Sequence, residues 1–389
     1  MGLVGNFFCQ WTEAALFRSV FPYDWRGIRM KKYLVFLLVI ILLSTACQTV
    51  NELPVKKETP HLAVIKERGK ANVVILNKDY KVVGEKKIGE FLIDGQVDGQ
   101  TLYAIDCGIE PALKNLYAIN VHDLSYQTLT LPYIPQKIFI HDRVAYIASS
   151  SVQQSGFPLM LVDLESLSLI DTFTVPGAAR PFIPEANGVT LYVNAGGPYK
   201  FGPYAKKVRV GKGTAGKYEI LETTDMPQEL PPTNVISYQE KNIAVYAGFA
   251  KGPKPRWVKQ PEAYTSKIKV LDKKNDSVLQ EIDLEESFPQ QIVRKDDLAF
   301  INHYTDLDMS GEMISVYDLK TMKLITKIRS ETPSSIALAG SHLLVANFVP
   351  GTVSVIDTQE RKQIQQVAVG EWPTKVLVVP DSSNPIPKE

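Results

Sequence analysis

Two Gly- and Pro-rich segments bring cationic and aromatic side chains together more densely than the rest of the chain. The residues concerned are Tyr199, Lys200 and Tyr204 in the first segment, and Lys251, Lys254, Arg256, Trp257 and Lys259 in the second. Cations beside rigid aromatic rings can bind anionic polymers, sugars or a protein surface. We therefore expect these residues to bind a ligand; the alternative is that both segments are solvated loops that cover the fold.

A third candidate for ligand binding is the pair Asn302 and His303, since His303 is the histidine that we expect in a long loop. The segment continues as DLDMSGE, where Asp306, Asp308 and Ser310 alternate as in the first half of a calcium-binding loop. The ninth and twelfth positions of that pattern hold Ile and Tyr, which are wrong for calcium ligands. These three residues are therefore a metal candidate with an incomplete ligand set. The sequence otherwise predicts no metal, no cofactor and no catalytic residues.

The N-terminal region has the residue types of an export signal. Met-Lys-Lys at 30–32 precedes an apolar run over 33–43, about half of the ~20 residues that span a bilayer core. Small residues then lead into Cys47. Residues 30–46 resemble a bacterial lipoprotein signal peptide, although Ser44 stands where that family usually has Leu, Val or Ile. The resemblance implies acylation of Cys47; an uncleaved anchor or ordinary secretion are the alternatives.

Three further segments flank the signal peptide and the folded region. Met30 is a natural start, so residues 1–29 are interpreted as a leader translated from an upstream start, unless they form a genuine extension. Residues 47–60 are polar with two prolines and are predicted to be a tether. Residues 61–381 are the predicted folded domain, and 382–389 a flexible tail.

The folded region is predicted to be all-β and repetitive. Short apolar runs alternate with Gly, Pro, Asn and Asp, and no helical period is sustained. One strand type recurs about every forty residues and ends in Asp or Asn, at Asn77, Asn120, Asp163, Asp272, Asp318 and Asp357. A seventh copy, around Arg209, fills the gap between the third and fourth of these. The Asp or Asn is expected to bond its own backbone where the third strand of each unit turns into the fourth.

The two ends of the folded region are complementary. The chain closes on one lone first strand, PTKVLVVPD at 373–381, and it opens with HLAVIKE at 61–67 and two further strands. One C-terminal strand and three N-terminal strands would complete a seventh sheet, which closes the ring and protects its edges. We therefore predict a seven-bladed β-propeller with 1+3 strand closure, with six or eight blades as alternatives.

The last full unit, with the strand ending at Asn347, the strand VSVID ending at Asp357 and the turn into VGEWPT, resembles the YVTN family of β-propeller repeats. In such propellers, the loops that join second to third strands surround one mouth of the central channel, beside the blade-to-blade crossings. The segments with Tyr199, Trp257 and His303 are loops of this kind. Function usually concentrates in variable loops on a rigid scaffold, so this face is the predicted site.

The net charge and the two resemblances limit the functions and partners that we expect. The net charge of +1 argues against nucleic acid as a partner. The combined resemblances imply a lipid-anchored protein on the outer face of a Gram-positive-type cell membrane. Its predicted partners are the bilayer, through acylated Cys47, and an envelope protein or an anionic or carbohydrate polymer. We expect a binding or scaffold module.

An enzyme is the alternative, because propellers of this type include lactonases and lyases with a site at the channel mouth. Such an enzyme would need carboxylates or histidines that converge from several blades. The candidates Asp106, Glu110, His303 and Asp306 form no recognisable set in the sequence.

Overall fold

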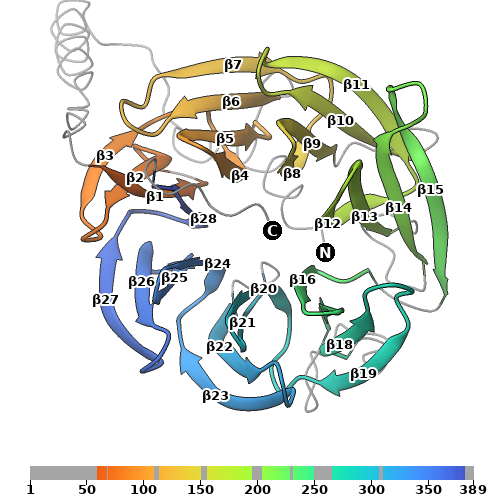
Figure 1. The fold of residues 1–389 in the computed structure, drawn as a ribbon. Coiled ribbons are helices and arrows are strands. Elements are labelled where there is room, and N and C mark those ends of the chain that lie inside the picture. The colour runs from red at the N-terminus through yellow and green to blue at the C-terminus, as the bar shows by residue number, and fades with distance from the viewer. Residues whose placement is uncertain are drawn as a thin grey trace, which may run out of the picture.

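The computed structural model describes residues 59–67, 69–108, 114–149, 156–194, 204–227, 231–248, 265–305 and 310–381. These residues form seven four-stranded antiparallel sheets arranged as the blades of a ring (Figure 1). The prediction of an all-β, seven-bladed propeller is confirmed. The described part of the chain contains no helix long and apolar enough to span a bilayer. The predicted leader, signal peptide, nearly all of the tether and the tail lie outside the described residues.

Blade one is built from both ends of the folded region. Its strand order is β28-β1-β2-β3, from the channel outward. Its strands are β28 (Pro373–Val378), β1 (Pro60–Lys66), β2 (Val73–Asn77) and β3 (Val82–Lys86). In the β28–β1 ladder, Val378 pairs with Leu62 and Val376 pairs with Val64. The predicted 1+3 closure is therefore confirmed.

The other six blades are consecutive in the chain, and each runs from an inner first strand to an outer fourth strand. Blades two to four are β4 (Leu92–Asp98), β5 (Thr101–Asp106), β6 (Asn115–Asn120), β7 (Tyr126–Thr130); β8 (Pro135–His141), β9 (Val144–Ser149), β10 (Phe157–Asp163), β11 (Ser168–Val175); and β12 (Ala178–Glu185), β13 (Gly188–Asn194), β14 (Tyr204–Lys212), β15 (Tyr218–Pro227). Blades five to seven are β16 (Asn234–Tyr238), β17 (Lys241–Tyr246), β18 (Lys267–Asp272), β19 (Val278–Asp283); β20 (Pro289–Lys295), β21 (Leu298–Thr305), β22 (Ser310–Asp318), β23 (Lys323–Arg329); and β24 (Pro333–Ala339), β25 (His342–Asn347), β26 (Thr352–Asp357), β27 (Lys362–Ala368).

The Asp or Asn that ends the third strand has the predicted role in six blades. Its side-chain oxygen accepts a hydrogen bond from the backbone N–H two or three residues later, as at Asn77, Asn120, Asp163, Asp272, Asp318 and Asp357. The bond replaces the ladder partner that the backbone loses as it leaves the sheet. In the remaining blade, the segment between β14 and β15 turns at Gly213–Gly216 instead.

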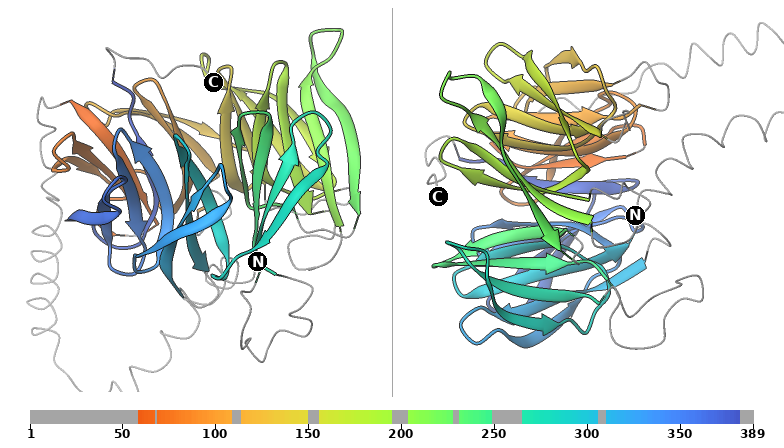
Figure 2. Two further views of the ribbon diagram at one scale, coloured as in Figure 1. Left: turned by 60° about the horizontal axis from the view of Figure 1, so that its bottom comes forward. Right: turned by 90° about the vertical axis from the view of Figure 1, so that its right-hand side faces the viewer.

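The strands run between the two faces of the ring (Figure 2). We call one the loop face; it carries the connections from second to third strands and the crossings between blades. The opposite, turn face carries the hairpin turns. Both ends of the described fold lie at the turn face, because Pro60 pairs with Asn77 there and the Val379 N–H donates to the His61 carbonyl.

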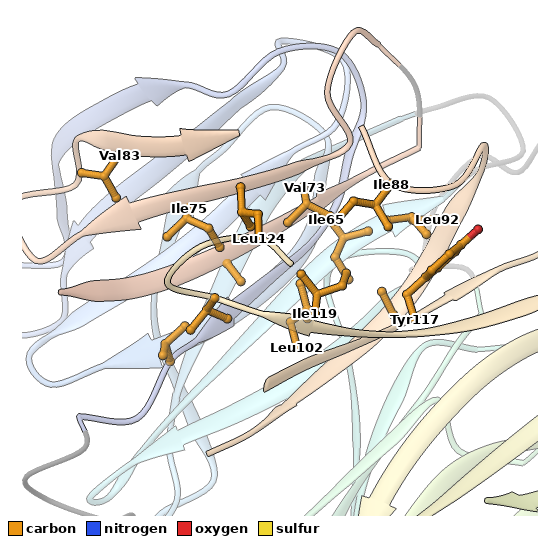
Figure 3. Packing of buried hydrophobic residues seen from close by; sticks show 14 residues of the cluster. Ile65, Val73, Ile75, Val83, Ile88, Leu92, Leu102, Tyr117, Ile119 and Leu124 are labelled. Atoms are coloured by element: carbon orange, nitrogen blue, oxygen red, sulfur yellow. The ribbon is translucent and has the colours of Figure 1, made fainter. Parts of the chain in front are cut away.

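The core lies between neighbouring sheets, so that every blade depends on the next. Between blades one and two, Ile65 and Val73 pack against Leu92 and Leu102, and all four side chains are fully buried (Figure 3). Five tyrosines of these sheets are buried as well, namely Tyr103, Tyr117, Tyr146, Tyr192 and Tyr246. The outermost strands are mostly exposed and carry scattered apolar side chains, as at Ile364.

Replacing Ile65 tests this interlocking. We expect Ile65→Ala to lower the free energy of unfolding by about 3 kcal/mol, because it leaves a cavity between blades one and two. The matched change Ile364→Ala, on an outer strand, should alter it by less than about 0.5 kcal/mol. Urea unfolding followed by circular dichroism measures both. Equal effects of the two changes would contradict the interblade core.

Candidate functional site

Most of the predicted ligand-binding residues belong to the connections that join second to third strands. Most of them fall in connections outside the described residues, namely Tyr199 and Lys200 between β13 and β14, Lys251, Lys254, Arg256, Trp257 and Lys259 between β17 and β18, and Asp306 and Asp308 between β21 and β22. Tyr204 and Ser310 are the first residues of β14 and β22, so their backbones lie at the loop face. Cys47 also lies outside the described residues. The roles given to all of these stay predictions.

Asn302 and His303 are described in full, and they do not lie in a loop. Strand β21 continues to Thr305, and the two side chains are 0% and 2% exposed. Asn302 accepts a hydrogen bond from the Gln291 N–H and donates one to the Pro333 carbonyl, at 2.8 and 2.6 Å. This corrects the expected loop placement: Asn302 links blade six to blade seven beneath the loops, and His303 bonds within blade six and to the crossing that enters it.

His303 is one member of a repeated set. In five blades, the residue that pairs with the start of the first strand is polar, buried and bonded to the crossing that enters the blade. The set comprises Lys66, Asp106, Ser149, His303 and Asn347, whose partners are the Val369 carbonyl, the Glu90 N–H, the Ile134 carbonyl, the Ser287 carbonyl and the Ser330 hydroxyl. We call these five residues the crossing anchors. Each satisfies a backbone or hydroxyl group that would otherwise be buried without a partner.

The Asp106 carboxylate makes several hydrogen bonds as a crossing anchor. It accepts hydrogen bonds from the N–H groups of Glu90, Phe91 and Gly108, at 2.7, 3.0 and 2.8 Å. Asp106 and His303 therefore serve different blades, while Glu110 and Asp306 lie outside the described residues. Among the described residues, no three His, Cys, Asp or Glu side chains are placed to hold a metal ion.

The His303 imidazole is held neutral inside blade six. Its Nδ1 lies 3.1 Å from the Ser287 carbonyl, to which it donates, and its Nε2 lies 2.9 Å from the Ser315 hydroxyl. Burial lowers the pKa of His303 to about 4, because the charged form would lose its hydration. In blade seven, Asn347 occupies the same position and donates to Ser354, the counterpart of Ser315.

A second set of polar residues, which we call the inner ring, lies on the innermost strands near the loop face. Each lies at or near the start of a first strand, and all but Lys137 bind the first strand of the next blade. Asn234 accepts from the Ile292 N–H, Gln291 from the Ile336 N–H, and Ser335 from the Val376 N–H. The remaining described members are Lys375, Asp94 and Lys137.

Asp94 is the charged centre of this inner ring. Its carboxylate is 3% exposed and lies 2.9 Å from the Lys375 ammonium and 3.7 Å from that of Lys137. It also accepts a hydrogen bond from the Ile138 N–H. Burial alone would raise the pKa of Asp94, but the two lysines outweigh it and hold that pKa below its usual value. Together, Asp94, Lys375 and Lys137 carry one more positive charge than negative charge, and they join blades one, two and three.

Three aromatic rings form a row on the loop face of blades six, seven and one. Phe348 lies 5.9 Å from Tyr304 and 5.4 Å from Trp372, with the latter pair stacked at 24°. Tyr304 and Phe348 are held at equivalent places, since their N–H groups donate to the Phe288 and Thr332 carbonyls. Trp372 remains half-buried.

The inner ring was not predicted, although the sequence contains a repeated signal for it. The first strands of four blades begin Pro-x-polar, with Lys137, Gln291, Ser335 and Lys375 in the polar position. That spacing marks equivalent sites, but it does not show that their side chains reach the next blade.

No protein-family model matches the sequence, and no curated protein matches it significantly. Solved structures share the fold. A functionally unknown protein from Desulfotomaculum acetoxidans is 11% identical with a TM-score of 0.60, over 83% of this chain and 100% of that one. Hydrazine synthase of Kuenenia stuttgartiensis is 14% identical with a TM-score of 0.58, over 80% and 98%. AztD of Citrobacter koseri is 12% identical with a TM-score of 0.55, over 82% and 97%. The likeness is one of fold alone.

The buried histidine predicts an acid-sensitive contribution to stability. The pKa of His303 is near 6.5 in the unfolded chain, whereas in the folded chain the imidazole is protonated only near pH 4. The contribution is therefore complete above pH 6.5 and is lost as the pH falls towards 4, by about 3 kcal/mol in all. We expect His303→Asn to unfold with a flatter dependence on pH over this window, because Asn347 shows that an amide fits the position.

Urea unfolding midpoints between pH 4 and pH 7 measure this difference. The exposed His122→Asn serves as the matched control and should leave the slope as it is in the unmodified chain. Parallel pH profiles for His303→Asn and the unmodified chain would contradict the assignment.

Proposed function

We propose that this chain is an extracytoplasmic lipoprotein, anchored through acylated Cys47, whose propeller is a binding or scaffold module. The basic start at 30–32, the short apolar run and the small residues before Cys47 support export and acylation. The final propeller unit supports assignment of the blades to the YVTN type of repeat. More than one acyl chain on Cys47 would hold the protein stably at the membrane.

The position of the chain ends carries the binding proposal. Because Pro60 lies at the turn face, the tether would join the ring on the side opposite the long loops. Fully extended, residues 47–60 reach roughly 45 Å from the anchor. The loop face would then point away from the bilayer, towards other components of the envelope.

The loop face is also the face that varies. In blade seven, β25 and β26 are joined by the short turn 348–351, whereas in blade five β17 and β18 are separated by residues 247–266. The crossing anchors fix the scaffold beneath, so loops can differ without disturbing the sheets. The cationic and aromatic composition of the longest connection favours an envelope protein or an anionic or carbohydrate polymer as the ligand.

Acylation is tested by replacing the cysteine. Growth with a clickable fatty acid should label the unmodified protein, and Cys47→Ser should abolish the label because position 47 then has no thiol to accept the diacylglyceryl group. Cys107→Ser is the matched control and should keep the label. A labelled Cys47→Ser protein, or an unlabelled parent, would refute the anchor.

Ligand binding is tested at the longest loop. We expect simultaneous replacement of Lys251, Lys254, Arg256, Trp257 and Lys259 by Ser to reduce recovery of envelope partners at least about tenfold, since the cations and the ring would supply more than about 1.4 kcal/mol. Affinity capture followed by mass spectrometry measures this. Lys273→Ser with Lys274→Ser, on the turn face, is the matched control. Equal recovery from both variants would count against the loop face.

A further inference from the structure

A cavity of about 450 Å³ opens on the turn face, between blades three and four. The two blades stand side by side at the upper right and right of Figure 1. The lining comes from four hairpin turns, two in each blade, so the cavity is unrelated to the long loops. Its volume is within the range of about 300–1,000 Å³ that is usual for small-molecule sites.

Contacts between the two blades hold the cavity open in a fixed shape. His141 Nε2 donates to the Glu185 carbonyl at 2.8 Å, and Phe139 stacks on Phe182 with ring centroids 5.6 Å apart. Within blade four, Gly188 lets its turn pack directly on β14, because a side chain there would overlap the Val210 carbonyl. The turn is thereby held within its own blade.

One wall of the cavity is aromatic. Tyr146 contacts Tyr218 edge to face, with ring centroids 6.3 Å apart, and the Lys212 ammonium lies 5.4 Å from the centre of the Tyr218 ring. Burial, and then the neighbouring Tyr218, raise the pKa of Tyr146, so its hydroxyl keeps its proton. Tyr218 is half-buried, while Lys212 is exposed and can move aside. The ring can then offer its face to an apolar surface of a ligand.

The polar walls alternate donors and acceptors. Asp142 lies 3.4 Å from the imidazole of His141, and Glu165 lies 3.5 Å from the guanidinium of Arg143. Asp163 accepts hydrogen bonds from its own turn. Three carboxylates and two cations thus line the cavity. The carboxylates would repel an anion with several charges. Arg143 and Lys212 would in turn repel a polycation.

A neutral ligand with many hydroxyl groups avoids both conflicts. A hydroxyl can donate to a carboxylate and accept from a guanidinium or an ammonium, so one ligand can satisfy both kinds of wall. A pyranose ring also presents C–H groups on one face, which suits the Tyr218 ring. We propose that this cavity binds a neutral saccharide of one or two sugar units. This inference does not depend on the proposed anchor or on the loop-face ligand.

The test uses the full chain in detergent and a panel of glucose, galactose, N-acetylglucosamine, maltose and cellobiose. Saturation-transfer NMR detects binding, and calorimetric titration measures affinity. At least one sugar should bind with a millimolar or lower dissociation constant. Tyr218→Ala should weaken that sugar about tenfold or more, and Arg143→Met should weaken it severalfold. Tyr218→Phe, which keeps the ring and therefore the fold, should bind nearly as well as the parent.

Arg361→Met, in the turn between the third and fourth strands of blade seven, is the control on the same face and should bind as the parent does. Inorganic phosphate and spermidine are the charged probes and should fail to compete with the sugar. The proposal is overturned if no sugar of the panel binds at millimolar concentration. It is equally overturned if a charged probe displaces the sugar, or if Tyr218→Ala and Arg361→Met bind alike.

Discussion

Pairing between the two ends of the folded chain is the constraint on which the rest of this structure depends. Strand β28 supplies the inner strand of blade one, and its ladder with β1 links residues more than three hundred positions apart. Without it, the ring would have an open edge and unpaired backbone groups at the channel. The Asp94 carboxylate reinforces the closure, because it binds Lys375 of β28 and Lys137 of blade three at the same time.

Closure separates the parts of the molecule that hold the fold from those free to vary. The crossing anchors and the inner polar ring satisfy buried hydrogen-bonding groups below the loops, where an unpaired group would cost about 1–3 kcal/mol. His303 and Asp106 are residue types that often act in catalysis, but here their side chains bond to the crossings. These bonds lie among the described strands and crossings. The fold can therefore support different ligands without repacking its blades.

Most of the fold could be predicted from local signals. The recurring Asp or Asn after the third strand acts within its own turn, so the sequence alone contains the whole interaction, as at Asp318. Closure was also predictable, because a lone strand at 373–381 and an incomplete unit at the start leave one solution. The end of β21 was not, since Asn302 and His303 read as polar loop residues until their partners in other strands are known.

Features that depend on contacts between two distant segments could not be predicted from the sequence. Asp94 and Lys375 lie far apart in the chain, and each alone looks like an ordinary surface charge. The turn-face cavity depends on how blades three and four are spaced, which Tyr218 and Arg143 do not reveal by type or position. The loop-face predictions built on Trp257 and its neighbours rest on residue chemistry alone.

Hydrogen exchange at β28 tests the closed ring most directly. If the ring is latched by this strand, those amides of 374–378 that donate to β1 exchange as slowly as the bonded amides of the central strands β25 and β26, because both open only when the whole propeller unfolds. Rapid exchange of these β28 amides while β25 and β26 remain protected would contradict the closure, and with it the architecture described above.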